Sequence, residues 1–258
     1  MRRSLSLQFY GVVVVLGLCG SPDSVADEDE PLKLNTRQRT SSGVETIQHN
    51  KQTYRVLNIS LQTHHIGLSS SPSALVVADS AKEKNPIAMM NAGMYHVDHR
   101  PVGLQIVEGV QTVPINLNKG KGNFFLLPNG VFAIDDQNQP HIVSSTTFDA
   151  SEKWRLATQS GPLLLLDGVY HPALAPTSSN VHIRNGICIS DTQVHWIISL
   201  EPVRFYDLAS LMRERLHCRD GLYLDGAISK LYFQVDGQWN EPISSEELGS
   251  WLVLYPKK

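Results

Sequence analysis

The sequence of 258 residues carries little net charge, few aromatic residues and only three cysteines. Its 22 basic and 25 acidic side chains leave a formal net charge of −3. A nucleic-acid-binding domain needs a basic surface, so this balance argues against nucleic acid as a partner. Beyond the N-terminal segment, no run is long and apolar enough to cross a bilayer, so no stable membrane span is expected.

Motifs that identify several enzyme classes are also absent. The sequence has neither a His-Glu-x-x-His pattern nor paired Cys-x-x-Cys motifs, so its ten histidines do not predict a transition-metal site. A Gly-x-Ser-x-Gly nucleophile elbow and a phosphate-binding loop are missing too. No cofactor is therefore expected, although Ca²⁺ or Mg²⁺ stays open because sites built from loop oxygens leave little linear pattern.

The N-terminus has the pattern of an export signal. Arg2 and Arg3 form a basic start, and Val12–Leu18 belongs to an apolar stretch too short to cross a bilayer comfortably. The small residues Ser24 and Ala26 then predict cleavage by signal peptidase after Ala26. The sequence therefore predicts a signal peptide and a periplasmic or secreted protein.

Lipoprotein anchoring at Cys19 is the competing interpretation. It is less favoured because a lipoprotein signal has a small residue before the cysteine, and this chain has Leu18. With residues 1–26 removed, the polar residues 27–50 predict a flexible N-terminal lead-in. Residues 51–258 are long enough for one domain with a full core.

Cys188 and Cys218 remain after that cleavage. An exported compartment is oxidising, so a disulfide between them is one interpretation, and two buried free thiols are the other. A nucleophilic cysteine is less favoured. The residues around Cys188 resemble a buried strand, and an apolar setting raises the pKa of a thiol.

Strand-like segments dominate the remaining sequence, and several flank short turn signals. Hairpins are predicted to turn at Glu108-Gly109, Pro128-Asn129-Gly130, Asp167-Gly168, Asp191-Thr192-Gln193 and Asp236-Gly237. The second of them assumes a strand over Asn123–Leu127. Helices are predicted over Ser73–Lys84, Phe148–Thr158 and Phe205–Cys218. The predicted fold class is α+β, a single domain with a large mixed, mostly antiparallel β-sheet and a few helices.

Asp225 is the most conspicuous candidate for chemistry. It follows the apolar segment Leu222–Leu224 and precedes Gly226, as expected for a carboxylate that a buried strand presents to a cleft. A turn aspartate before glycine is an equally open interpretation. Ser229 lies four residues further on and could face the same pocket.

Arg184 and two other polar positions are further candidates. Arg184 could pair with an acid in the fold, or it could clamp a phosphate or carboxylate with its planar fork. Ser160 precedes Gly161, and from spacing alone a simple turn is the favoured interpretation there. Asn91, close to Gly93, could bond a sugar hydroxyl or cap a loop.

Six short segments occur in a fixed order: Asn91–Tyr95, Pro101–Leu104, Gly122–Phe125, Ser160–Pro162, Ile183–Gly186 and Leu224–Gly226. Together they resemble the phosphodiester glycosidase family, and the likeness runs from about Tyr54 to Tyr255. The resemblance implies an exported hydrolase that cleaves the glycosidic bond of a sugar-1-phosphodiester. A GlcNAc-phosphodiester or a cell-envelope phosphoglycan would be its substrate.

The resemblance also implies roles for the matching residues. Asp225 and Arg184 would be catalytic, and substrate would contact Asn91, Gly93, Asn123, Ser160, Gly161 and Ser229. Ala227 departs from the pattern, because relatives usually carry a hydroxyl residue or glycine there. A non-catalytic envelope module that binds glycan or phosphoglycan is therefore an alternative. So are a periplasmic assembly protein and a metal-dependent phosphodiesterase that cuts the P–O bond.

Overall fold

Antiparallel β-strands make up most of the structure, a computed structural model that describes residues 38–39, 43–191, 193–226 and 228–257. The predicted signal peptide, Cys19, much of the predicted lead-in and Ala227 lie outside these ranges. Within them the fold class is α+β, as predicted, with few helices. The predicted single large sheet is instead divided into three.

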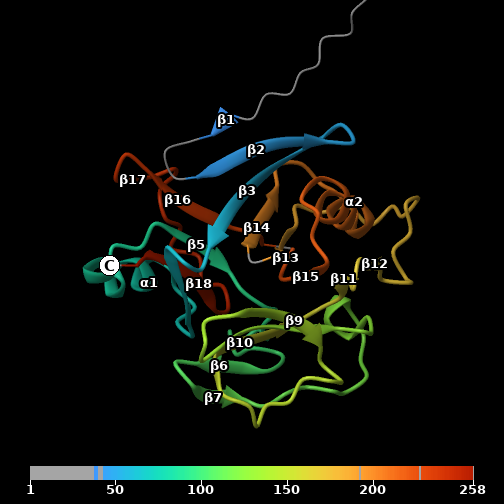
Figure 1. Cartoon of the computed structure of the whole chain (residues 1–258), viewed down its shortest axis with the longest axis horizontal. Helices are drawn as coiled ribbons and strands as arrows, with labels where there is room; N and C mark the ends of the chain where they lie inside the picture. Colours follow the sequence, from blue (N-terminus) through green and yellow to red (C-terminus); the bar gives the residue numbers. More distant parts are fainter. Residues whose placement is uncertain (1–37, 40–42, 192, 227, 258) are drawn as a thin grey trace, which may run out of the picture. The chain divides into compact units, whose positions relative to one another are not determined.

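The largest sheet has eight strands in the order β1-β2-β3-β14-β13-β15-β11-β12 (Figure 1). Its strands are β1 Gln38–Arg39, β2 Val44–His49, β3 Gln52–Ser60, β11 Leu163–Leu166, β12 Val169–Tyr170, β13 Asn185–Ser190, β14 Gln193–Ser199 and β15 Asp220–Tyr223. Central strands such as β14 are buried along most of their length, since both faces of this sheet are covered.

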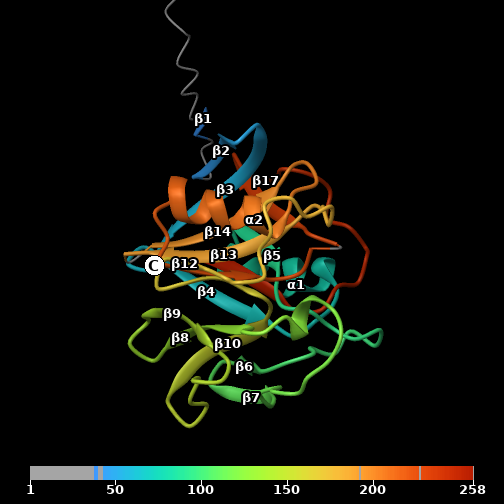
Figure 2. The same cartoon turned by 90° about the vertical axis from the view of Figure 1, so that its right-hand side faces the viewer.

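Two five-stranded sheets complete the fold (Figures 1 and 2). The order β7-β6-β10-β8-β9 joins β6 Gln105–Val107, β7 Val110–Val113, β8 Gly130–Asp135, β9 Pro140–Ser144 and β10 Trp154–Ser160. The order β17-β16-β5-β18-β4 joins β4 His64–Ser69, β5 Ala88–Asn91, β16 Leu231–Val235, β17 Gln238–Trp239 and β18 Trp251–Pro256.

Two of the three predicted helices are present. α1 spans Ala74–Ser80, is capped by the Ser73 hydroxyl and continues into the 3₁₀ helix η1 Lys82–Lys84. α2 spans Phe205–Ser210 and passes directly into the π-helical turn η3 Leu211–Arg215. The prediction of a helix over Phe148–Thr158 is wrong: residues 148–153 form a turn without helix, and Trp154–Thr158 belongs to a strand. That strand is β10, which pairs with both β6 and β8.

Four of the five predicted hairpins form, and their turns explain why. At Glu108-Gly109, Asp167-Gly168 and Asp236-Gly237 both turn residues have positive φ, as a type I′ turn requires. β13 and β14 also pair across Asp191. The strand predicted over Asn123–Leu127 is wrong, because η2, a 3₁₀ helix over Asn123–Phe125, replaces it.

The ordered domain begins earlier than the predicted boundary at residue 51. β2 pairs with β3 along its whole length, and both Val44 and Ile47 on it are buried. The apolar residues of β2 therefore belong to the core. For these residues, the prediction of a flexible lead-in up to residue 50 is wrong.

The main hydrophobic core lies where the three sheets meet. It contains Trp196 from the eight-stranded sheet, Met90 and Leu252 from one five-stranded sheet, and Phe132 and Leu156 from the other. Burial of large side chains from all three sheets gives the strand ends in this region fixed positions relative to one another.

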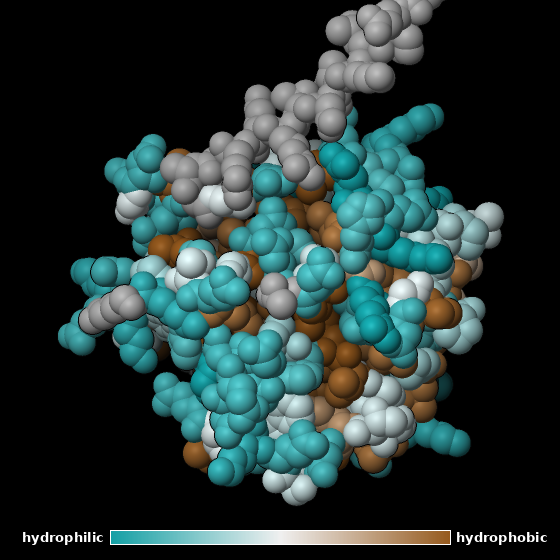
Figure 3. Space-filling view, in the orientation of Figure 1, coloured by the Kyte–Doolittle hydropathy of each residue, from teal (hydrophilic) through white to brown (hydrophobic). Residues whose placement is uncertain are grey.

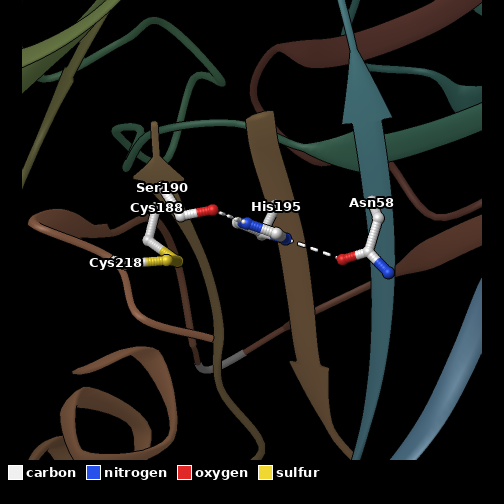
Figure 4. The surroundings of a disulfide bond; sticks show 5 residues. All are labelled: Asn58, Cys188, Ser190, His195 and Cys218. Atoms are coloured by element: carbon white, nitrogen blue, oxygen red, sulfur yellow. Dashed lines mark hydrogen bonds between the residues drawn. A yellow bond between two sulfur atoms is a disulfide. The ribbon is translucent and has the colours of Figure 1, made fainter. Parts of the chain in front are cut away.

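The opposite face of the eight-stranded sheet is covered by α2 and η3. Leu208 and Met212 pack there against Cys188 and Cys218, which form a disulfide (Figure 4). The predicted pairing of these cysteines is therefore present. The bridge fixes the chain that follows η3 to the centre of the sheet, 30 residues away in sequence.

The surface drawn in Figure 3 is mostly hydrophilic, with apolar patches between the polar side chains. Most large apolar side chains lie inside the buried clusters. Among the described residues, no helix has the length and hydropathy needed to cross a membrane.

Candidate functional site

Strands from all three sheets end close together at the predicted site. Asn91 is the last residue of β5, Ser160 is the last of β10, and Asn185 is the first of β13. Asp225 follows β15 by two residues. These positions belong to distant parts of the sequence, and side-chain hydrogen bonds connect their segments directly.

Asn185 is the centre of this cluster. Its amide nitrogen lies 2.9 Å from the Asn91 carbonyl oxygen and 3.0 Å from Asn91 Oδ1, and it donates to both. Its Oδ1 accepts a 2.9 Å hydrogen bond from the backbone N–H of Asp225. Asn91 Oδ1 also accepts a hydrogen bond of 2.8 Å from the backbone N–H of Lys230. One buried side chain therefore ties the end of β5 to the segment that carries Asp225.

The two predicted serines bond to backbone of the same segment. Ser160 Oγ donates to the Leu224 carbonyl at 2.6 Å, and the whole residue is buried. Ser229 Oγ donates to the Asp225 carbonyl at 2.8 Å and lies 3.4 Å from the Ile183 carbonyl. Both hydroxyls thus hold the backbone on either side of Asp225.

Two glycines allow the close approach of neighbouring backbone. A Cβ on Gly93 would lie 2.5 Å from the carbonyl oxygen of Gln159, next to Ser160. A Cβ on Gly161 would lie 2.6 Å from Asn129 Cβ and 2.8 Å from the Phe124 carbonyl oxygen. The loop after β5 and η2 can therefore press against the end of β10 only because these positions lack side chains.

Arg184 is buried completely, with an exposed fraction of 0%. Its Nε donates to the Val203 carbonyl at 2.8 Å, and its Nη2 donates to Asn180 Oδ1 at 2.6 Å. The guanidinium carbon lies 3.7 Å from the ring centre of Phe205. Of the three guanidinium nitrogens of Arg184, Nη1 alone has no hydrogen-bond partner among the described residues. One guanidinium nitrogen, itself buried, is thus left without a partner, so Arg184 does not present a bidentate fork to an anion.

Tyr223 lies beside that guanidinium. Its ring centre is 5.4 Å from the Arg184 guanidinium carbon, and its hydroxyl occupies the space that a Cβ on Gly226 would need. Burial raises the pKa of Tyr223 to about 12, with a further upward effect of Asp225 and an opposing effect of Arg184. Its hydroxyl is therefore protonated at neutral pH and can donate a hydrogen bond.

Asp225 is half-buried and lies within electrostatic range of two tyrosines. Its charge contributes to raising the pKa of both Tyr223 and Tyr95, in each case after burial. Tyr95 stacks on the His99 ring at a centroid distance of 5.6 Å. The charge of Asp225 thus acts on two phenols, and one of them, Tyr223, lies beside the buried guanidinium of Arg184.

The structure does not join every predicted residue to this cluster. Asn123 begins η2, whose neighbour Phe124 contacts Gly161, but no hydrogen bond of the Asn123 side chain is among the described contacts. Ala227 lies outside the described residues. Among the described residues, no three His, Cys, Asp or Glu side chains gather as a metal site. Whether Ca²⁺ or Mg²⁺ binds, which the sequence leaves open, is not tested by this arrangement.

A comparison with protein families finds a known domain over most of the chain. A family model described as phosphodiester glycosidase matches residues 84–254 and so includes β5, β10, β13 and β15. The chain belongs to the phosphodiester glycosidase family.

One curated protein is similar to this chain in sequence. The Escherichia coli (strain K12) protein YigE, itself uncharacterized, is 36% identical over 160 residues. The match covers 62% of this chain and 63% of YigE, so this chain spans less than two thirds of that relative's length.

Three solved structures share the fold at 11% identity. The catalytic domain of zebrafish N-acetylglucosamine-1-phosphodiester alpha-N-acetylglucosaminidase, auto-inhibited by its pro-peptide, has a TM-score of 0.58 and covers 83% of this chain and 82% of its own. A hypothetical Synechocystis protein has a TM-score of 0.54, with coverage of 84% and 62%. A Burkholderia pseudomallei protein described as exported has a TM-score of 0.51, with coverage of 83% and 74%.

Sequence reasoning assigns no role to three residues of this cluster. Asn185 and Tyr95 lie inside segments that carried the resemblance, but no role was assigned to them. In the sequence, Tyr223 is recognisable only as part of an apolar strand. Its nearness to Asp225 in the sequence is the one available signal.

Proposed function

We propose that this protein is an exported hydrolase that cleaves the glycosidic bond of a sugar-1-phosphodiester. The observation that carries the proposal is the cluster in which Asn185 ties the Asp225 segment to Asn91. Membership of the phosphodiester glycosidase family supports a glycosidase-type reaction. The sugar, the group beyond the phosphate and the stereochemistry of the reaction are not part of the proposal.

In the proposed reaction the bond between the sugar C1 and the phosphate oxygen breaks. A phosphomonoester leaves with the bonding electrons, and a water oxygen ends on the sugar. Asp225 accepts the proton of that water, or it attacks C1 itself before water releases the sugar. Phosphate is a good leaving group, so less help from a general acid is needed than for an ordinary glycoside.

Arg184 and Tyr223 would stabilise the departing phosphate. The Tyr223 hydroxyl stays protonated because the pKa of this residue is raised to about 12, so it can donate to a phosphate oxygen. Arg184 lies behind it and supplies a buried positive charge and one unpartnered N–H. The role of Arg184 is thus electrostatic support, and Asn91, Ser160 and Ser229 would hold the surrounding backbone in place.

Turnover of a GlcNAc-1-phosphodiester tests the assignment. We expect Asp225→Asn to lower kcat about 10²- to 10⁴-fold, the usual range for loss of an acid–base group. Arg184→Lys should lower it about 10²- to 10³-fold, as for removal of one preorganised donor. The exposed Asp79→Asn on α1 is the matched control and should leave the rate unchanged. Equal rates in all variants would contradict the assignment.

Labelled water separates the proposal from cleavage of the P–O bond. The glycosidase reaction places the solvent oxygen on C1 of the sugar, whereas a metal-dependent phosphodiesterase places it on phosphorus. The label on phosphate would overturn the proposed bond cleavage.

Circular dichroism spectra of each variant in the turnover assay show whether a lost rate reflects lost folding.

Export of the protein is part of the proposal. The disulfide Cys188–Cys218 fits an oxidising compartment, and one solved relative is described as exported. The predicted cleavage after Ala26 can be checked by N-terminal sequencing of protein recovered from the periplasm or medium. A mature chain that begins at Asp27 is the expected result.

A non-catalytic glycan-binding module is a second candidate, which one observation favours. Arg184 and Ser160 have no exposed surface, so neither reaches a ligand without some movement. Binding of an envelope phosphoglycan with unchanged ligand after long incubation would select this candidate over the hydrolase.

A further inference from the structure

A cavity of about 340 Å³ lies beside the edge strand β4, away from every residue of the candidate site. Its walls come from β4, η1, the turn between β6 and β7, β10 and β18. The residues that matter for its chemistry are His65, Ser69, Lys84, Glu108, Arg155 and Tyr255. None of the segments that carry the family resemblance contributes to its lining.

Two cations line this cavity without an acid partner. Arg155 donates to the Ile66 carbonyl at 2.7 Å and to Asn138 Oδ1 at 3.1 Å, and its Nη1 lies 3.1 Å from His65 Nε2. All three partners are neutral groups. Lys84 Nζ lies 5.8 Å from the ring centre of Tyr255. Among the described residues, no carboxylate lies within 4 Å of either cation.

The electrostatics of the cavity follow from this arrangement. Burial lowers the pKa of Arg155, and the charge of Asp135, which is not within 4 Å, only partly opposes this shift. The pKa of His65 is lowered by burial and then by Arg155, Lys257 and Lys84, while Glu108 opposes the shift. The imidazole is therefore held neutral in a positive field that one carboxylate only partly balances.

We propose that this cavity binds the anionic group of a small molecule, a phosphate or a carboxylate, between Lys84 and Arg155. An anion would supply a counter-charge in direct contact, which neither cation has among the described residues. The hydroxyl of Ser69 offers a further hydrogen bond from the wall of the cavity. The side chains of Leu68, Val253 and Tyr255 form an apolar wall for the body of the ligand.

Titration of the full chain with inorganic phosphate and with acetate tests the proposal. Isothermal calorimetry gives the affinity, and amide chemical shifts show where each anion binds. We expect shifts of the amides of Ser69, Lys84 and Glu108. Saturation by either anion supports the proposal and identifies which anionic group the cavity prefers. If neither anion saturates the cavity at about 50 mM, the Kd is weaker than the millimolar value expected of a minimal ligand. That result would overturn the proposal.

Charge variants show whether the two cations are responsible. Lys84→Met should weaken anion binding about fivefold, since one nearby charge at a partly exposed site contributes about that much. Glu108→Gln should strengthen it by a similar factor. Lys82→Met on the same short helix η1 is the matched control, because Lys82 does not line this cavity. Equal affinities of wild type and Lys84→Met would overturn the proposal.

Sulfate keeps its charge between pH 5 and 8, so it isolates the response of His65. Arg155, Lys84 and Lys257 disfavour the imidazolium, Glu108 favours it, and the neutral Tyr255 ring packs at 6.2 Å. A bound anion favours the imidazolium too, so sulfate affinity should rise as the pH falls from 7 to 5.5. His65→Gln should lose this rise. Shifts confined to the amides of Asp225 and Gly226 would place the anion elsewhere and overturn the proposal.

Discussion

His195 is the residue whose surroundings set a measurable pH dependence. Its side chain lies almost fully inside the eight-stranded sheet, with ring nitrogens 2.6 Å from Ser190 Oγ and 2.7 Å from Asn58 Oδ1 (Figure 4). Burial lowers the pKa of His195 from 6.5 to about 4. Between these two values the unfolded chain binds a proton that the folded chain does not bind. The stabilisation is therefore complete above pH 6.5 and is lost as the pH falls toward 4.

We expect the free energy of unfolding to fall by about 3 kcal/mol over that range, at about 1.4 kcal/mol per pH unit. Urea unfolding at pH 7, 5.5 and 4.5 measures it. His195→Gln removes the titrating group and should flatten this part of the slope, whereas the exposed His182→Gln should not. A slope that is the same in wild type and His195→Gln would show that other groups cause it.

The residues of the candidate site could be predicted only in part. Asp225 stands out because it follows an apolar run and precedes a glycine, and Arg184 stands out because it directly precedes a strand-like apolar segment. Nothing in that local pattern shows which way a side chain points or what already bonds to it. The bond of Arg184 to Val203 joins residues 19 apart, and the bonds of Asn185 to Asp225 and to Asn91 join residues 40 and 94 apart. Their part in catalysis stays a prediction.

At the scale of elements, local turn chemistry decided which predictions were right. Glu108-Gly109 and Asp167-Gly168 have the positive φ values of tight hairpins, and the strands on either side of each turn pair as predicted. The segments that failed depend on distant partners. Gln159 Oε1 accepts hydrogen bonds of 2.9 Å from the backbone N–H groups of Leu104 and Asn116, and these bonds fix the loops near η2. A single-sequence pattern does not contain such a contact.

The contact between the loop after β5 and the end of β10 gives a prediction at this scale. Gly93→Ala would place a methyl group 2.5 Å from the backbone carbonyl oxygen of Gln159, and neither strand end can move without disturbing its sheet. We expect a loss of about 1–3 kcal/mol in the free energy of unfolding, as for other overpacked sites. Urea unfolding measures it.

Gly168→Asn is the control for that variant. Gly168 has φ +74 and open space around its Cβ position, and asparagine tolerates this conformation. Its stability should stay within about 1 kcal/mol of the wild type. If Gly93→Ala were as stable as Gly168→Asn, the two strand ends would not be in fixed contact.

At the scale of the whole molecule, the three sheets share one core, and the candidate site lies where strands of each sheet end. The sequence predicted the α+β class because strand patterns and turns are local. It did not predict the division into three sheets, because the order β3-β14-β13-β15-β11 combines segments that are far apart in the chain. The disulfide is the covalent link in this arrangement, and it connects β13 to the chain after η3.

Removal of that disulfide tests how far it stabilises the domain. Closing a loop between residues 30 apart restricts the unfolded chain by about 3–4 kcal/mol in the loop-entropy model. Cys188→Ala with Cys218→Ala should therefore lower the free energy of unfolding by about that amount, measured by urea unfolding without reductant. Dithiothreitol should bring the wild type down to a similar stability and leave the double variant unchanged. An equal response of both proteins to the reductant would mean that the wild type in solution does not hold this bond, and its stability would then come from the shared core alone.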